Sequence, residues 1–443
     1  MTAVGMEISL CLQSSGYMPE KRNIALITLD SLRADHCSFM GYHRKTTPTI
    51  DKMAKEGLYF ENAIASGVAT PTSMFGIFTG EYPFTSYEVD KLNGNDWRKE
   101  IKSKKTLAQV LRKKGYFTGA IHANPAASSF FGFSKGFQYF QDFVKGKKQS
   151  GVLSSLFNKL GFGSFYENMR AVIKRESTST DWKRLIPEII DFIEKCETPY
   201  FLWVLLLDTH IPYIAPKEFR KFGSKHLPQL IYQNWKVRRN YLNPNKLSES
   251  DRNGIINAYD DAILYADKFV EKLWHMLKDT DPIFIIHADH GEGFGEHGFY
   301  YHPPMLYEEL IHVPLIIYNA DVKGRIEKPV SLLGLAPSIL ELIGEENEFP
   351  SESFLHGGRD WVISKVFEGE KRKVAVRTKD WKFITGQKED DELYNLKEDP
   401  HEQENVINEH PELAKEMRRI VEIHVKQETE KRRIRERISR LNV

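Results

Sequence analysis

The chain has 443 residues, of which 41% are hydrophobic and 12% aromatic, enough for one large α/β domain and a smaller one. A formal net charge of +1 gives no overall attraction to nucleic acid or to an anionic membrane. Cys11, Cys37 and Cys196 are widely spaced and odd in number, which predicts no disulfide framework and favours a reducing compartment. No stretch has the length of a transmembrane helix, and the first residues do not resemble a signal peptide. We therefore expect a cytoplasmic protein without a nucleic-acid partner.

The first apolar strand candidate ends in an acid. Residues 23–30, NIALITLD, form a short apolar run that predicts a buried strand with Asp30 at its carboxyl end. Taken alone, Asp30 is better explained as a turn or helix-capping residue than as a metal ligand. Residues 46–57, TTPTIDKMAKEG, then predict a helix, because a capping threonine and a final glycine frame apolar residues at helical spacing.

A threonine stands at the start of the next predicted helix. Residues 58–64 predict a strand, and a helix follows from Thr70 to Gly80. Because proline is favoured at the first helical position, Pro71 places Thr70 at the N-cap. The end of a helix where backbone N–H groups are free favours anions and developing negative charge. Beside a divalent cation, the Thr70 hydroxyl could attack phosphorus or sulfur, although an ordinary capping threonine gives the same pattern.

Two more predicted strands run into polar residues. The elements predicted in this part of the chain are helices at residues 105–115 and 181–195 and strands at residues 117–122 and 199–207. The first strand leads to Asn124, and the second, PYFLWVLLL, leads to Asp208 and His210. We interpret residues 145–179 as an insertion and residues 215–246 as a lid or rim.

The most informative stretch is residues 283–302, IFIIHADHGEGFGEHGFYYH. It follows a helix predicted at residues 247–277 and opens with a continuous apolar run, as expected for a strand covered on both faces. The run ends in Asp289 and His290, two types of metal ligand, at the edge where open α/β sheets bind their ligands. Hydrogen-bonded loops also contain such pairs, so the pattern gains its meaning from the other strand ends.

The C-terminal part has a different texture. Residues 313–318 predict a strand and residues 332–343 a helix, after which short strands at 374–378, 381–385 and 392–396 predict an antiparallel sheet. Residues 411–443 predict a helix whose basic end is either a solvated face or a docking site. We expect a doubly wound α/β fold with a mainly parallel sheet, divided into a catalytic domain at residues 22–350, a C-terminal subdomain at 351–410 and the basic helix at 411–443.

Several segments, in order, are similar to motifs of the sulfatase branch of the alkaline phosphatase superfamily. They are LITLDSLRADHCSFMGY with TTPTIDKMAKEG, then DTHIPY, then IFIIHADHGEGFGEHG followed by His302, LYEE and HVPLII, and finally RTKDWKFI with ELYNLKEDPHEQEN. The resemblance covers most of the chain and implies an alkaline-phosphatase-like sheet with a small C-terminal α+β subdomain.

The resemblance also implies roles for single residues. Asp30, Asp289 and His290 would bind a metal ion, and Thr70 would be both nucleophile and ligand. Two histidines, His210 and His302, would contact the substrate or protonate the leaving group. Asn124 falls near a position where this branch carries a substrate-contacting polar group.

The sequence departs from the sulfatase pattern at the nucleophile. Sulfatases of this branch carry cysteine or serine, matured to formylglycine, in a C/S-x-P-S/A-R signature. Thr70 occupies that position, Thr72 replaces the proline and Met74 replaces the arginine, and Ser31 stands where a second acid usually follows Asp30. A threonine instead resembles the phosphoryl-transfer members, which include phosphodiesterases and the phosphoglycerol and phosphoethanolamine transferases.

Other registers and functions stay open. Thr72 or Ser73 would be the nucleophile if the turn shifted. The ligand set favours one Zn²⁺ or Mn²⁺ ion over Mg²⁺ or Ca²⁺, because the latter prefer oxygen ligands, and Asp208, His210 and His302 have the residue types for a second metal. We expect a metal-dependent hydrolase or transferase of phosphate esters. The alternatives are a sulfatase acting on a sulfated small molecule or glycan, and a non-catalytic anion-binding protein. The basic helix could also pair two copies of the chain.

Overall fold

An eight-stranded sheet runs through the computed structural model, which describes residues 21–83, 94–143, 181–241, 243–368, 371–386 and 391–441. Its strand order is β12 (Gly324–Ile326), β2 (Leu58–Phe60), β11 (Leu315–Tyr318), β7 (Ile283–His287), β1 (Ile24–Leu29), β6 (Tyr200–Leu206), β4 (Phe117–His122) and β5 (Tyr139–Gln141). Within this sheet, β11 runs antiparallel to both neighbours and every other pair is parallel. The insertion predicted at residues 145–179 lies outside the described residues.

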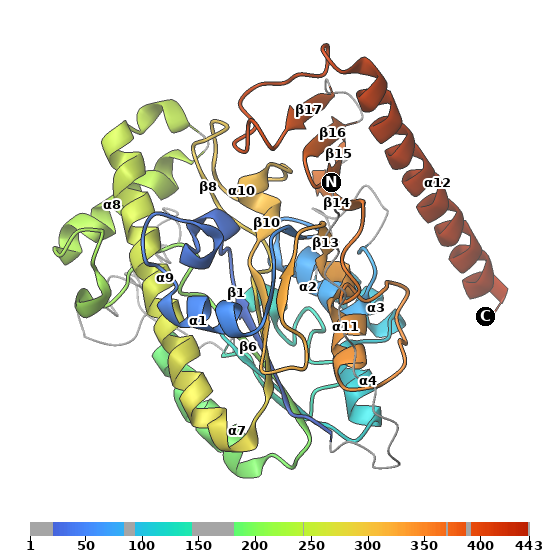
Figure 1. The fold of residues 1–443 in the computed structure, drawn as a ribbon. Helices are drawn as coiled ribbons and strands as arrows, with labels where there is room; N and C mark the ends of the chain where they lie inside the picture. Colours follow the sequence, from blue (N-terminus) through green and yellow to red (C-terminus); the bar gives the residue numbers. More distant parts are fainter. Residues whose placement is uncertain are drawn as a thin grey trace, which may run out of the picture.

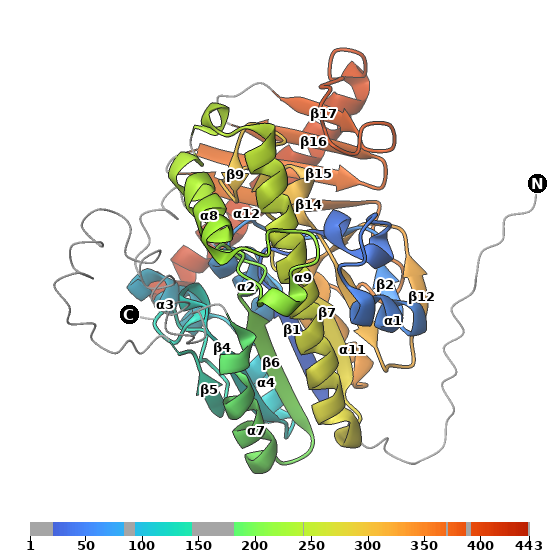
Figure 2. The same cartoon turned by 90° about the vertical axis from the view of Figure 1, so that its left-hand side faces the viewer.

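Helices cover both faces of this sheet (Figure 1, Figure 2). One face carries α1 (Pro48–Glu56), α7 (Ile186–Lys195) and the long α9 (Glu249–Leu277), against which α8 (Leu227–Asn240) packs. The opposite face carries α2 (Thr70–Thr79), α4 (Leu107–Lys113), which α3 (Gly94–Ser103) precedes, and α11 (Leu335–Leu342). The predicted doubly wound, mainly parallel architecture is confirmed. Among the described helices, none is long and apolar enough to cross a membrane.

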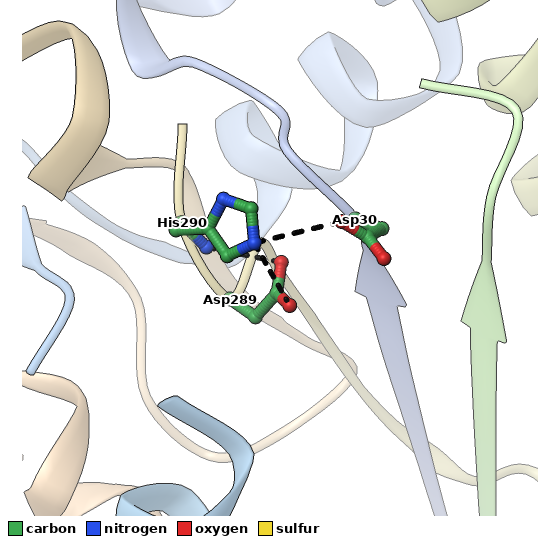
Figure 3. A group of neighbouring side chains, drawn as sticks. All are labelled: Asp30, Asp289 and His290. Carbon is green, nitrogen blue, oxygen red and sulfur yellow. Dashed lines mark hydrogen bonds and ion pairs between the residues drawn. The ribbon is translucent and has the colours of Figure 1, made fainter. Parts of the chain in front are cut away.

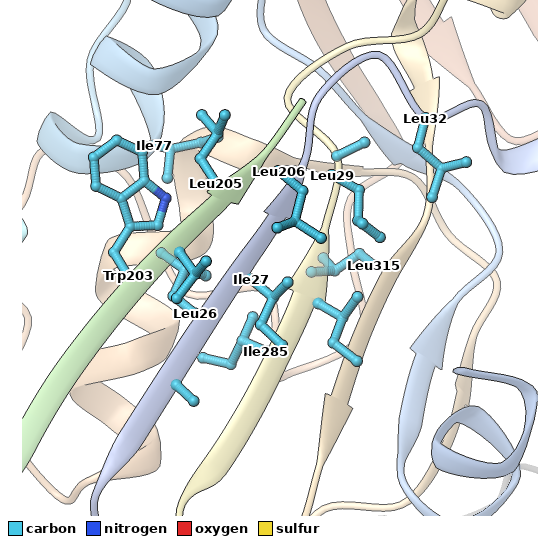
Figure 4. Close-up of a cluster of buried hydrophobic side chains, with 14 of the residues drawn as sticks. Leu26, Ile27, Leu29, Leu32, Ile77, Trp203, Leu205, Leu206, Ile285 and Leu315 are labelled. Atoms are coloured by element: carbon cyan, nitrogen blue, oxygen red, sulfur yellow. The ribbon is translucent and has the colours of Figure 1, made fainter. Parts of the chain in front are cut away.

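The central strands supply the core. All six residues of β1 are buried, and their side chains interleave with those of β6, β7 and β11, as Figure 4 shows for Leu26, Trp203 and Ile285. Burial on both faces explains why these strands read as continuous apolar runs rather than as alternating ones. Each Å² of apolar surface that is buried contributes about 25 cal/mol to stability. This burial favours the arrangement and fixes the ends of the strands in space.

A four-stranded antiparallel sheet follows near the end of the chain. It consists of β14 (Trp361–Glu368), β15 (Lys371–Thr378), β16 (Trp381–Gly386) and β17 (Glu392–Asn395). The helix α12 (Pro411–Leu441) packs on β15 and β16 through Met417 and Val421, which meet Val376 and Phe383 in a small apolar cluster. The predicted C-terminal antiparallel sheet is confirmed.

The structure corrects three element predictions. The strand predicted at residues 58–64 is divided between β2 and β3 (Ala63–Ile64), which belong to different sheets. The strand predicted at 313–318 is interrupted at Pro314, which has no N–H group to donate, and gives β10 (His312–Val313) and β11. The sequence prediction missed β14, because the buried Lys365 interrupts its apolar pattern and is paired with Glu428 of α12.

Three short strands complete the fold around the site. β13 (Val330–Ser331) pairs with β3, which also pairs with β10. β8 (Gly293–Phe294) and β9 (Tyr300–Tyr301) form a hairpin directly after β7. The short helix α10 (Glu308–Ile311) leads from this hairpin into β10. The start of the loop after β7 is bonded to α10, because the N–H groups of Gly291 and Glu292 donate to the carbonyl oxygens of Leu310 and Glu309.

The contact between β4 and α7 gives a test of this packing. An added Cβ at Gly119 would overlap the ring of Phe192, which is fully buried. We expect Gly119→Ala to lower the free energy of unfolding by about 1–3 kcal/mol, because the crowded ring must shift. Urea unfolding of the full chain measures the loss.

A second substitution identifies the cause. In Gly119→Ala/Phe192→Leu the ring is gone, so the two losses should sum to more than the loss of the double variant. Strict additivity would show that the overlap with Phe192 is not what destabilises the alanine variant.

Candidate active site

Two neighbouring strands bring three ligand-type side chains together. Asp30 follows β1, and Asp289 and His290 follow β7, which lies parallel to and next to β1. Each residue offers one ligand atom within 4.8 Å of the others, and all three are buried. His290 Nε2 lies 3.7 Å from Asp30 Oδ1 and 3.6 Å from Asp289 Oδ2 (Figure 3). Among the described residues, this is the one group with the spacing of a metal site.

The hydrogen bonds of this triad leave one imidazole nitrogen and one carboxylate oxygen without a partner, and both atoms can bind a cation. His290 Nδ1 lies 2.9 Å from the carbonyl oxygen of Gly291 and donates to it, so Nε2 keeps its lone pair. His290 Nε2 and Asp289 Oδ2 are buried and have no hydrogen-bond partner. Burial and the neighbouring carboxylate of Asp30 raise the pKa of Asp289. Two buried acids beside an imidazole lone pair fit a divalent cation, which would relieve the repulsion between them.

Hydrogen bonds and close backbone contacts hold the loops that carry these side chains. Ser31 adopts a left-handed backbone conformation with φ of 62°, and its N–H donates to Asp289 Oδ1 at 3.3 Å. The hydroxyl of Tyr259, on α9, donates to the carbonyl oxygen of Ser31 at 2.7 Å. A Cβ at Gly291 would overlap the carbonyl oxygen of Glu309, so this position admits glycine alone without a shift of the backbone. The triad is therefore held by the backbone as well as by its own side chains.

Thr70 meets the triad at the start of α2. Its hydroxyl donates to Asp30 Oδ2 at 3.3 Å. Asn124, two residues after β4, donates from Nδ2 to the same oxygen at 2.5 Å and to Thr70 Oγ1 at 3.2 Å. The structure thus brings Asp30, Thr70, Asn124, Asp289 and His290 to one edge of the sheet.

The prediction that Thr70 is an N-cap is wrong. The helix has Ala69 at its N-cap, with an extended backbone, and Thr70 is the first helical residue. The Thr70 hydroxyl therefore faces the carboxylates and does not cap the helix. Thr72 donates to the carbonyl oxygen of Ala69 at 2.8 Å, and Ser73 to that of Gly67 at 3.0 Å, so both alternative nucleophiles are turned to the backbone.

Two histidines border the triad. The ring of His302 lies 4.5 Å from that of His290 and 5.4 Å from that of His210, measured between centroids. His210 Nδ1 donates to the carbonyl oxygen of Ile211 at 2.9 Å. Asp208, which was expected to have the chemistry for a second metal, accepts from the backbone N–H of Trp182, and it forms no metal-type group with these histidines in the described chain.

Sequence reasoning missed one buried acid of the site. Glu292, two residues after His290, is fully buried and accepts hydrogen bonds from His302 Nδ1 at 2.9 Å and from the Tyr213 hydroxyl at 2.7 Å. Burial alone would raise the pKa of Glu292, but His302, His210 and Tyr213 hold it below its ordinary value. The sequence offers one signal for this role of Glu292. It lies in the loop after the buried strand β7, where a carboxylate that is not exposed must be hydrogen-bonded or paired with a charge.

Comparison with known proteins shows the family to which the chain belongs. The sulfatase family model matches residues 22–345. An arylsulfatase of Clostridium perfringens is 26% identical over 467 aligned positions, which cover 90% of this chain and 94% of the relative.

Two solved structures have the same fold. One is a phosphonate monoester hydrolase of Agrobacterium radiobacter, with a TM-score of 0.71, 19% identity and coverage of 92% of this chain and 96% of that one. The other was solved in complex with its substrate D-glucosamine-2-N,6-O-disulfate, with a TM-score of 0.68, 17% identity and coverage of 93% and 99%. From its matched family model, its relatives and its fold, the chain belongs to the sulfatase family and is an ester hydrolase of the alkaline phosphatase superfamily.

Proposed function

We propose that the protein cleaves phosphate mono- or diesters of a small molecule or glycan, or transfers the phosphoryl group, through a covalent intermediate on Thr70. The observation that carries this proposal is the Thr70 hydroxyl, which is buried beside the triad and bonded to Asp30. Threonine is not matured to formylglycine, because its Cβ carries a methyl group. Its hydroxyl must therefore act as an alcohol nucleophile.

The surroundings of Thr70 support an attack on phosphorus. The start of α2 stabilises negative charge on the transferred group, and Asp30 can accept the hydroxyl proton. We assign Asn124 Nδ2 to donate to a non-bridging oxygen of the ester in place of its present bond to Thr70 Oγ1. A divalent cation held by Asp30, Asp289, His290 and Thr70 would supply charge neutralisation and a lowered hydroxyl pKa. The imidazole ligand favours Zn²⁺ or Mn²⁺ over Mg²⁺ or Ca²⁺.

The histidines are assigned to the leaving group and the substrate oxygens. Once Thr70 Oγ attacks phosphorus, the departing oxygen gains negative charge and leaves faster if it is protonated. His302 and His210 border the triad and are partly exposed, so their rings can reach a bound ester. In the second step the same histidine takes a proton from the water or alcohol that releases the phosphoryl group.

A second candidate function is sulfate ester hydrolysis. The family model and the arylsulfatase relative favour it, and a sulfate ester carries the same tetrahedral arrangement of oxygens. Thr70 and Met74 disfavour it, because the residue to be matured and the arginine that steadies it are both replaced. The expected cytoplasmic location, the domain limits and the pairing of two copies stay predictions.

Thr70→Ala should abolish turnover of 4-nitrophenyl phosphate, bis(4-nitrophenyl) phosphate and 4-nitrophenyl sulfate, with a loss of about 10³-fold or more in kcat, because the nucleophile is gone. Thr70→Ser should keep part of the activity, because a primary hydroxyl takes the same place. Steady-state rates with added Mn²⁺ or Zn²⁺ measure both.

The controls are Thr72→Ala and Ser73→Ala, whose hydroxyls bond to the backbone, and which should keep most of the activity. Wild-type turnover of the sulfate alone would replace the proposal by the sulfatase alternative. Full activity in Thr70→Ala would overturn the role of this residue for either ester.

Asp289→Asn should stabilise the metal-free protein. Because the pKa of Asp289 is raised, the folded state favours its protonated form, and the stability this gives is lost as pH rises through that pKa. The melting temperature of metal-free Asp289→Asn should therefore exceed that of the metal-free wild type by an amount that grows above about pH 4, the ordinary range of a carboxyl pKa.

With excess Mn²⁺ or Zn²⁺, the wild type should instead have the higher melting temperature, because the asparagine variant lacks one charged ligand. Thermal unfolding between pH 4 and pH 8, with EDTA or with metal, gives both comparisons. A difference in melting temperature between the two metal-free proteins that does not change with pH would show that the charge of Asp289 does not destabilise the fold.

A further inference from the structure

Glu292 is anchored on every side. Its side chain is fully buried, and its two oxygens are used separately, Oε1 by His302 Nδ1 and Oε2 by the Tyr213 hydroxyl. Its backbone N–H donates to the carbonyl oxygen of Glu309 at 2.9 Å, and its own carbonyl oxygen accepts from Arg33 Nη1 at 3.1 Å. The carboxylate can therefore neither rotate nor move toward solvent without breaking several bonds.

This anchor determines how His302 is presented. The ring donates from Nδ1 to Glu292, so Nε2 lies on the opposite edge of the ring, away from the carboxylate. The side chain of His302 is 24% exposed, whereas that of Glu292 is wholly buried. The ring of His302 is therefore bonded to a buried carboxylate on one side and is partly exposed to solvent. It lies next to the rings of His290 and His210.

Packing alone does not explain this arrangement. Burying a carboxylate is costly unless it is hydrogen-bonded, and apolar residues of the same size often fill such a space with equal or greater stability. A carboxylate behind an imidazole, with the free nitrogen facing a reactive centre, is instead a recurrent way to fix a tautomer and its direction. The ring of His302 lies 4.5 Å from that of His290 in the triad, which favours this second explanation.

We propose that Glu292 is a positioning residue that holds His302 with Nε2 directed at the leaving oxygen of the ester. This inference rests on the proposed function of Thr70. When Thr70 Oγ bonds to phosphorus, the bond from phosphorus to the leaving oxygen breaks and its electron pair stays on that oxygen. The oxygen takes the Nε2 proton of His302 and departs as an alcohol. His302 is left neutral, with its Nδ1 proton still donated to Glu292.

The test is a double-mutant cycle of Glu292→Gln and His302→Asn in the full chain, assayed with phenyl and 4-nitrophenyl esters of the same phosphoric acid. Phenolate is the poorer leaving group and depends more on protonation. Glu292→Gln should lower kcat/KM for the phenyl ester by about 10- to 100-fold, and that for the 4-nitrophenyl ester by less than about threefold. In the His302→Asn background it should cost nothing further, because it acts through that ring.

Two outcomes would overturn the inference. Equal losses on the two esters would show that Glu292 does not serve the leaving group. The same loss with and without His302 would show that it supports the fold or the metal site directly. Thr70→Ala, measured alongside, separates this failure from that of the proposed function, because only the latter leaves Thr70→Ala active.

A milder variant covers the case in which Glu292→Gln does not fold. Tyr213→Phe removes one hydrogen bond to Glu292 and leaves its bond to His302, so it should reduce turnover of the phenyl ester severalfold and spare the 4-nitrophenyl ester. Equal effects of Tyr213→Phe on both esters would count against the inference. Metal content by plasma mass spectrometry and the melting temperature should match the wild type.

Discussion

The repulsion between two buried carboxylates is the constraint on which the site depends. Asp30 and Asp289 end adjacent parallel strands, so the sheet itself brings them together with His290, and burial denies them water. A cation bound between them would relieve this repulsion, and the hydroxyl of Thr70 approaches the same centre because α2 begins there. The spacing of a metal site, the raised pKa of Asp289 and the hydrogen bond from Thr70 to Asp30 all depend on the adjacent ends of β1 and β7.

The sequence predicted this part of the molecule well for a physical reason. Strands covered on both faces must be continuously apolar, so a polar residue directly after such a run lies at the carboxyl edge of the sheet. Asp30, Asn124, Asp289 and His290 could each be placed in this way. The family resemblance then joined them across long distances in the chain, and the matched family model spans all of them.

What the sequence could not reveal depends on contacts between distant segments. Ala69, not Thr70, is the N-cap of α2, and the Thr70 hydroxyl donates to Asp30 instead, which no pattern of residue types indicates. Lys365 hides β14 because its partner, Glu428, is 63 residues away. Glu292 is one of many acids until Tyr213, 79 residues earlier, and His302 are seen to share its two oxygens.

Because the central strands are parallel, the candidate site lies at one edge of the sheet, and the opposite edge carries none of its residues. The chemistry gathers where β1, β4 and β7 end, whereas these strands begin at the opposite edge, with Ile24 the first residue of β1. Handles for immobilisation, fluorescent labels or fused partners attached near the starts of these strands would lie at the edge of the sheet away from Asp30, Asn124 and Asp289. With the same polarity, a change in the loops at the site edge can alter which ester is bound without altering the buried strands beneath them.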